Sequence, residues 1–158
     1  MAELDKEKIN SLVKELSEYH IRFIGYAKQA RRELKTNLGR VFEALSFSKQ
    51  IQALHILNHT GCIGNTKENL TALTGDVEVC SSSNVGESSE MEEVIGRFNE
   101  IEEKNKHLYT CAKDAVESEK DLNIGNVNVC SKCGYVLASD VPKECMICRS
   151  PSGYFRIF

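Results

Sequence analysis

Apolar residues recur every three or four positions through three long stretches of the chain, a spacing typical of amphipathic helices. The first stretch carries an apolar stripe made of Ile9, Leu12, Val13, Leu16, Tyr19, Phe23, Ala27, Ala30 and Leu34. A second helix is predicted over residues 38–59, and Thr36 offers a turn and an N-cap before it. Gly61 ends this helix, because glycine readily adopts the backbone conformation that closes a helix. A third helix is predicted over residues 89–116.

The remaining segments are shorter and less regular. A short helix is expected to begin at Thr66, which would serve as its N-cap, and to be broken at Gly75. Residues 81–89 are rich in serine and predict a flexible polar loop. Near the C-terminus, short β-like runs begin at Asn128, Tyr135 and Tyr154.

Composition and charge indicate a globular protein. The 158 residues are 41% hydrophobic and 27% charged, with a formal net charge of −3 and a pI near 5.8. This charge gives no support to nucleic-acid binding, and no apolar run approaches the ~20 residues that a membrane helix needs. The first residues are charged where a secretory signal has its apolar core, so we expect a cytoplasmic protein without membrane or nucleic-acid partners.

Four of the seven cysteines form two Cys-x-x-Cys pairs near the C-terminus, made of Cys130, Cys133, Cys145 and Cys148. Eleven residues separate the pairs. Four thiolates so spaced suit one tetrahedral metal ion, for which zinc and iron are the common candidates. A segment this short cannot bury enough apolar surface to fold unaided, so we expect metal binding to supply much of its folding free energy. Cys62, Cys80 and Cys111 are expected to be reduced thiols, with a disulfide or a redox-sensing role as the alternative.

The residues around the cysteine pairs extend the motif. Gly134 and Tyr135 follow the first pair, Pro142 precedes the second pair, and Pro151 and Phe155 come after it. Over residues 129–158 this pattern resembles the rubredoxin-like end of the rubrerythrin family. In the helical part, Ala27-Lys28-x-Ala30-Arg31 and Thr66-x-Glu68-Asn69-Leu70 also look like positions of that family. Arg149 departs from the pattern, because a small residue, often glycine, usually follows the fourth cysteine.

The resemblance implies a mainly α protein with three parts. These are a ferritin-like helical bundle over residues 1–118, with its third helix shortened, a linker over 119–128 and a rubredoxin-like β domain over 129–158. It also implies one iron per chain on the four cysteines, with zinc as the alternative metal. In that family the iron relays electrons to a di-iron centre in the bundle, which reduces peroxide. The resemblance therefore implies electron transport in oxidative stress defence, with a reductase or a peroxidase as redox partner, and it permits a homodimer.

The resemblance does not extend to the residues that bind the di-iron centre in that family. Such a site needs Glu-x-x-His on two helices, because residues i and i+3 share a helix face. This chain has four histidines, and none of them has a glutamate three residues before it. Alignment by the flanking resemblance places the expected pairs at Lys49/Gln52 and Glu102/Asn105, so only Glu102 remains as a potential ligand. We therefore expect no intact di-iron peroxidase site.

Two alternatives to electron transfer stay open at this point. One is a peroxidase whose rearranged metal site in the bundle is built from Glu15, Glu18, Glu43 and Glu102. The other is a structural zinc ribbon whose helices bind a protein partner. A four-cysteine site accepts either metal, so the sequence alone does not separate iron from zinc, and the family resemblance favours iron.

Overall fold

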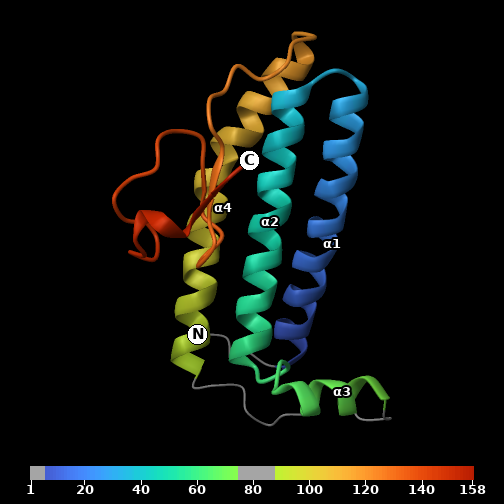
Figure 1. The fold of residues 1–158 in the computed structure, drawn as a ribbon, viewed down its shortest axis with the longest axis vertical. Helices are drawn as coiled ribbons and strands as arrows, with labels where there is room; N and C mark the ends of the chain where they lie inside the picture. The colour runs from blue at the N-terminus through green and yellow to red at the C-terminus, as the bar shows by residue number, and fades with distance from the viewer. Residues whose placement is uncertain (1–5, 75–87) are drawn as a thin grey trace.

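Three long helices form the body of the molecule in the computed structural model, which describes residues 6–74 and 88–158. The long helices are α1 (Lys6–Arg32), α2 (Thr36–His59) and α4 (Ser88–Glu117), and a short helix, α3 (Thr66–Thr74), follows α2. Helix α2 packs against both α1 and α4, while the short α3 lies at one end of the long helices (Figure 1). The predicted long helices are confirmed. The predicted serine-rich loop falls almost entirely outside the described residues.

A small antiparallel sheet follows the helices. Its strands are β1 (Asn128–Cys130), β2 (Val136–Leu137) and β3 (Phe155–Ile157), in the order β2-β1-β3. Both β1 and β2 contact α2, and Val129 and Val136 belong to the same buried cluster as Val41 and Leu45 of α2. The mainly helical fold with a small C-terminal β part is therefore confirmed, and the sheet shares its core with the helices.

The apolar stripe of the first helix is buried for most of its length but fails at two positions. Ile9, Leu16 and Phe23 are buried, whereas Tyr19 is 42% exposed and Leu34 is 86% exposed. Helix α1 ends at Arg32, and Leu34 lies in the following turn with a φ of 61°. The predicted apolar stripe of the first helix therefore does not extend to Leu34, which lies beyond the end of α1 and is exposed to solvent.

The N-terminus of α2 is capped from a distant part of the chain, which corrects the predicted cap at Thr36. The Asp121 carboxylate accepts hydrogen bonds from the N–H groups of Asn37 at 2.8 Å and Leu38 at 3.0 Å. Burial tends to raise the pKa of Asp121, but these backbone hydrogen bonds outweigh it and hold that pKa below its usual value. The segment after α4 is thus tied to the start of α2.

The predicted cap of the short helix was wrong by one residue. Asn65, rather than Thr66, is the N-cap: its side-chain oxygen accepts from the Glu68 N–H at 3.0 Å. The Glu68 carboxylate in turn accepts from the Asn65 N–H at 2.8 Å. This reciprocal pair is a capping box, which satisfies two N–H groups that the helix itself leaves without partners.

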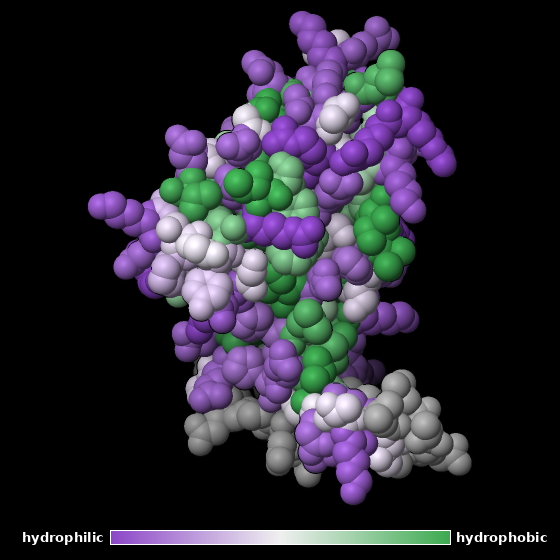
Figure 2. Space-filling model, in the orientation of Figure 1, coloured by the Kyte–Doolittle hydropathy of each residue, from purple (hydrophilic) through white to green (hydrophobic). Residues whose placement is uncertain are grey.

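Hydrophilic residues predominate on the face of the molecule seen in Figure 2, and apolar residues there form separate patches. Within residues 6–74 and 88–158, no helix is long and apolar enough to cross a membrane.

Candidate metal centre

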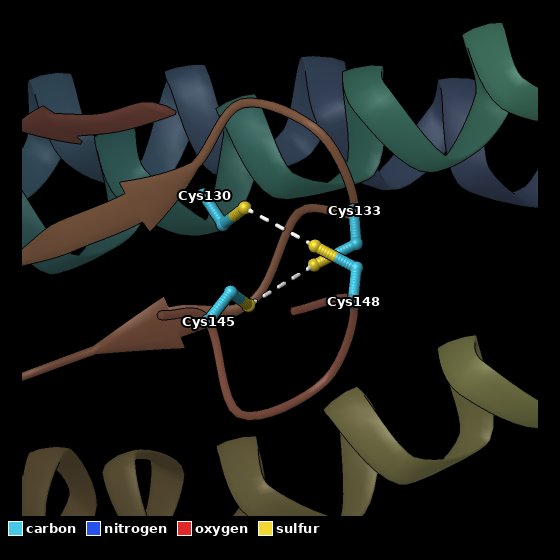
Figure 3. A group of neighbouring side chains, drawn as sticks. All are labelled: Cys130, Cys133, Cys145 and Cys148. Atoms are coloured by element: carbon cyan, nitrogen blue, oxygen red, sulfur yellow. Dashed lines mark hydrogen bonds between the residues drawn. The ribbon is translucent and has the colours of Figure 1, made fainter. Parts of the chain in front are cut away.

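Two loops of the same backbone design carry the four cysteines. In the first, the Gly134 N–H donates to the Cys130 carbonyl at 2.8 Å, and in the second the Arg149 N–H donates to the Cys145 carbonyl at 3.0 Å. Each loop closes again where the N–H of its first cysteine donates to a carbonyl five residues later. These turns bring the two sulfurs of each pair close together, and Figure 3 shows the four side chains converging.

The separations between the sulfurs fit a tetrahedral metal site. Cys130 Sγ lies 3.7 Å from Cys148 Sγ, Cys133 Sγ lies 3.7 Å from Cys145 Sγ, and all four lie within 4.8 Å of one another. A disulfide would need about 2.05 Å. Four sulfurs at ~2.3 Å from one metal ion would lie ~3.8 Å apart. Among the described side chains, no other group of three or more histidine, cysteine or acidic ligands comes together in this way.

The surroundings of the sulfurs are mostly apolar and closed to water. Cys130, Cys133 and Cys145 are buried in a cluster that includes Ile56 of α2 and Phe98 of α4, and Cys148 is partly exposed. Figure 3 shows the sulfurs in the space between the ribbons of α2 and α4. Without metal, the hydrogen bond with Cys133 is the main cause that lowers the pKa of Cys130, to about 5, and the same contact raises the pKa of Cys133. The cluster therefore holds protons that metal binding would release.

The residue after each pair adopts a left-handed backbone. Gly134 has a φ of 84° and Arg149 a φ of 62°. Glycine adopts this conformation freely, while a residue with a side chain pays roughly 1 kcal/mol for it. Arg149 thus keeps the loop geometry of the family pattern at a small cost in stability and removes no ligand.

The first cysteine loop is fixed to α2 by two hydrogen bonds. The Ser48 hydroxyl, fully buried, donates to the Gly134 carbonyl at 2.5 Å. Nε2 of His55, two turns further along α2, bonds the Lys132 carbonyl. Because Lys132 and Gly134 flank Cys133, α2 holds the backbone on both sides of a predicted ligand.

We expect Gly134→Ala to destabilise the protein by about 2 kcal/mol or more. A Cβ at this position would lie 2.8 Å from the Ser48 carbonyl oxygen, and its φ of 84° already disfavours any side chain. Urea denaturation followed by circular dichroism measures the change. Gly125→Ala is the matched control, because a Cβ there meets nothing within 4 Å, and its stability should stay within ~0.5 kcal/mol of the parent. Equal effects of the two substitutions would contradict the proposed close contact.

The aligned di-iron positions of the bundle do come together, but they form an ion pair. Lys49 Nζ lies 2.5 Å from a Glu102 carboxylate oxygen, and the side chain of Lys49 is 7% exposed. Asn105 Nδ2 and the Tyr109 hydroxyl each lie 3.3 Å from the same carboxylate. Burial, followed by the Glu102 charge, raises the pKa of Tyr109, so this phenol stays protonated and donates.

The other acidic candidates do not form one cluster with Glu102, although Glu15 and Glu18 line one small pocket together. Glu18 pairs with Arg22 at 2.5 Å and Glu43 pairs with Arg31 at 2.8 Å, while Glu15 shares a cavity with Glu102. The four glutamates of the alternative site are therefore not gathered at one point.

Of the three other cysteines, the structure describes two. Cys62 is disulfide-bonded, so the expectation of a reduced thiol was wrong there. Cys111 is a free thiol, with its Sγ 3.6 Å from Nε2 of His107. Cys80 lies outside the described residues.

Sequence reasoning found the four cysteines but missed Ser48 and Tyr109. A serine in the middle of a helix has no spacing signal, and only the glycine after Cys133 hints that another backbone approaches there. In the sequence, Tyr109 looks like an ordinary apolar position of α4. Its hydrogen bond to Glu102, two turns earlier on the same helix, has no signal in the sequence.

The helices and the cysteine cluster together define a ferritin-like bundle joined to a rubredoxin-like metal-binding part. A scan against models of protein families finds no match. Rubrerythrin-2 of Clostridium acetobutylicum is 25% identical over an alignment 162 positions long, gaps included, which covers 88% of each chain. The fold is similar to nigerythrin in a mixed-valence state (TM-score 0.59, 16% identity) and in a fully reduced, all-ferrous state (TM-score 0.53, 19% identity). Each match covers 96% of this chain and 85% of nigerythrin.

The chain is therefore similar in sequence to a rubrerythrin and in fold to nigerythrin, and its four-cysteine cluster fits a rubredoxin-like metal site.

Proposed function

We propose that this protein carries out one-electron transfer through a mononuclear iron centre held by Cys130, Cys133, Cys145 and Cys148. Iron with four thiolate ligands supplies a one-electron couple when bound. The single observation that carries the proposal is the set of 3.7 Å sulfur separations, which suits a tetrahedral ion. The name of the all-ferrous neighbour, an iron protein, favours iron over zinc.

The environment of the cluster is suited to passing electrons. Three of its cysteines are buried, so water is kept from most of the site, while Cys148 is partly exposed. Met146, between the ligands of the second pair, is 52% exposed. This edge gives a redox partner, a reductase or a peroxidase, a short approach to the centre.

The contents of the bundle favour electron transfer over peroxidase chemistry. A protonated lysine has no lone pair to offer a metal, and Lys49 places its positive charge against Glu102. Gln52 and Asn105 offer neutral amides where the family pattern has histidines. The proposed role is therefore that of a cytoplasmic electron carrier in the defence against peroxide or oxygen stress. In this role the protein has no di-iron site of its own.

Metal analysis and a visible spectrum of the anaerobically purified full chain test this proposal. We expect one iron per chain, a red ferric-thiolate colour and a reversible one-electron reduction. Because recombinant protein often takes up zinc, a colourless preparation is first unfolded, stripped of metal and refolded with ferrous iron.

Two results would replace the proposal with one of its alternatives. A protein that refolds only with zinc and shows no reduction wave would be a structural zinc ribbon. About three irons per chain with peroxide-driven turnover would indicate a peroxidase, and Cys145→Ser in the full chain should then leave metal in the bundle. Glu103→Gln, a substitution on the exposed face of α4, is the control variant for the metal analysis of Cys145→Ser.

A further inference from the structure

The two cysteine loops differ in the residue that closes their turns. In both loops this residue donates its N–H to the carbonyl of the first cysteine and has a positive φ, 84° at Gly134 and 62° at Arg149. Glycine adopts this conformation without strain, whereas arginine does not. The second loop therefore keeps a charged side chain where glycine would be more stable. Backbone strain that a protein retains in this way points to a functional residue.

Arg149 lies at the exposed edge of the cysteine cluster. It follows Cys148, the one cysteine of the four that is not buried, and its own side chain is exposed. Met146, in the same loop, is 52% exposed. The first loop leaves no room for a side chain, because a Cβ at Gly134 would lie 2.8 Å from the carbonyl oxygen of Ser48 in α2. The strained arginine is thus on the loop that another protein can reach.

A short turn, Ser152–Tyr154, joins the two loops into one surface. The Ser131 N–H of the first loop donates to the Tyr154 carbonyl at 2.8 Å. The Ser152 N–H donates at 3.0 Å to the carbonyl of Lys143, which lies just before the second loop. Lys132 places its Nζ 4.5 Å from the centre of the Tyr154 ring, and this ring is 43% exposed.

The charge of this surface is positive although the chain as a whole is negative. Residues 129–158 have four cationic and two acidic side chains, in a chain of net charge −3. Lys132, Lys143 and Arg149 are all exposed. Among the described residues, none of these three forms an ion pair with a carboxylate.

Two nearby carboxylates reduce this positive charge without reversing it. Glu144 follows Lys143 directly and is exposed. Burial, followed by the charges of Cys145 and Glu100, raises the pKa of Tyr135, so Glu100 of α4 lies within electrostatic reach of the cluster. Lys104 Nζ lies 4.0 Å from the Glu100 carboxylate and balances it. Three cations therefore face one unbalanced carboxylate, that of Glu144.

We propose that Arg149, Lys132 and Lys143, together with the exposed Met146 and Tyr154, form a docking surface for a small acidic electron-carrier protein. Exposed apolar and aromatic side chains with charges around them are typical of protein interfaces. Complementary charge speeds the encounter of two proteins and fixes their orientation. The surface would bring the acidic partner to Cys148 in spite of the net negative charge of this chain. The electron-carrier role of the partner rests on the proposed electron transfer.

Paramagnetic mapping of the zinc-loaded full chain, which is redox-silent, tests for the surface. The probe is hexacyanochromate(III), an inert anion that broadens the NMR signals of nearby amides, and tris(ethylenediamine)chromium(III) is its cationic counterpart. We expect the anion to broaden the amides of Lys132, Met146 and Arg149 before those of the helices, and the cation to spare them. Even broadening over the whole molecule by the anion, or stronger broadening of these amides by the cation, would overturn the proposal.

Three substitutions at Arg149 separate its charge from its backbone. Arg149→Gln should weaken anion binding by about threefold or more, while Arg149→Lys, which keeps the charge, should stay within about twofold of the parent. Arg149→Gly should lose as much affinity as Arg149→Gln, yet raise the melting temperature by about 2–4 °C because the strain is gone. Arg32→Gln, at an exposed arginine in the last turn of α1, is the matched control and should leave binding unchanged. Equal losses in Arg149→Gln and Arg32→Gln would mean that only net charge matters and would overturn the proposal.

The iron-loaded chain tests whether the surface serves electron transfer. A reduced plant-type ferredoxin, an acidic donor with a potential of about −400 mV, is mixed with the ferric protein in a stopped-flow instrument. The rate constant should fall by about tenfold between ~20 and ~200 mM salt, because salt screens the attraction between the two surfaces. Arg149→Gln should lower it by about threefold or more at low salt, and Arg149→Lys should restore it. A rate constant that rises with salt would show that the net negative charge of the chain governs the encounter, which would overturn the docking role.

Failure of the docking surface and failure of electron transfer give different results. A coloured, reducible protein without an anion site at this edge would overturn only the docking surface. A zinc protein that shows no reduction wave but binds the anion at these amides would keep a surface for an acidic protein and would overturn electron transfer. Tighter binding of a short DNA duplex than of ferredoxin at the same amides would mean a nucleic-acid surface and would overturn the acidic protein partner.

Discussion

Cys145→Ser is expected to abolish stoichiometric metal binding and to lower the melting temperature of the whole molecule by roughly 10 °C or more. Structural metal sites contribute about 10 kcal/mol or more to folding, and 1 kcal/mol moves the midpoint of a chain this size by about 2–4 °C. The effect should reach the helices, because Cys130, Cys133 and Cys145 belong to the same buried cluster as Ile56 and Phe98. Metal analysis and thermal unfolding followed at a helical circular dichroism signal measure both effects.

Cys111→Ser is the matched control for this loss. Cys111 is a free, partly buried thiol outside the cluster, so its replacement should leave the metal content unchanged. Chelation of the parent protein should reproduce the melting behaviour of Cys145→Ser. Helices that melt at the parental temperature after metal loss would show that the cysteine part is an independent unit, contrary to the shared core.

Glu102→Gln is expected to destabilise the protein by about 3 kcal/mol, while Lys49→Met should cost less than about 1 kcal/mol. The difference follows from burial: the side chain of Lys49 is 7% exposed, whereas that of Glu102 is 36% exposed. Removing the carboxylate leaves a buried ammonium without a counter-charge. Removing the ammonium leaves a carboxylate that water can reach, and methionine fills the same space. Urea denaturation of both variants measures the difference.

The double variant Lys49→Met with Glu102→Gln completes the cycle. It should recover most of the stability that Glu102→Gln loses, because no unpaired charge remains in the bundle. Glu103→Gln, whose side chain is 71% exposed, is the control for loss of an acidic residue and should change stability by less than about 0.5 kcal/mol. A larger loss in Lys49→Met than in Glu102→Gln would contradict the ion pair as the structure places it.

The parts of the fold that local pattern controls were predicted well. Helices α2 and α4 have nearly their expected limits, because a helix that packs against neighbours must repeat apolar residues at its own period. Local pattern failed at Leu34 and at the two helix caps. Asp121 caps α2 from far along the chain, and no local signal identifies such a partner.

The sequence by itself predicted that the four cysteines form one metal site, and it contains no Glu-x-x-His pair, since ligand type and spacing along a loop or helix are local properties. Only the tertiary structure decided that Ser48 bonds the loop after Cys133 and that Lys49 meets Glu102. These contacts join residues of separate elements. Their existence depends on how helices and sheet pack, which no spacing along the chain records.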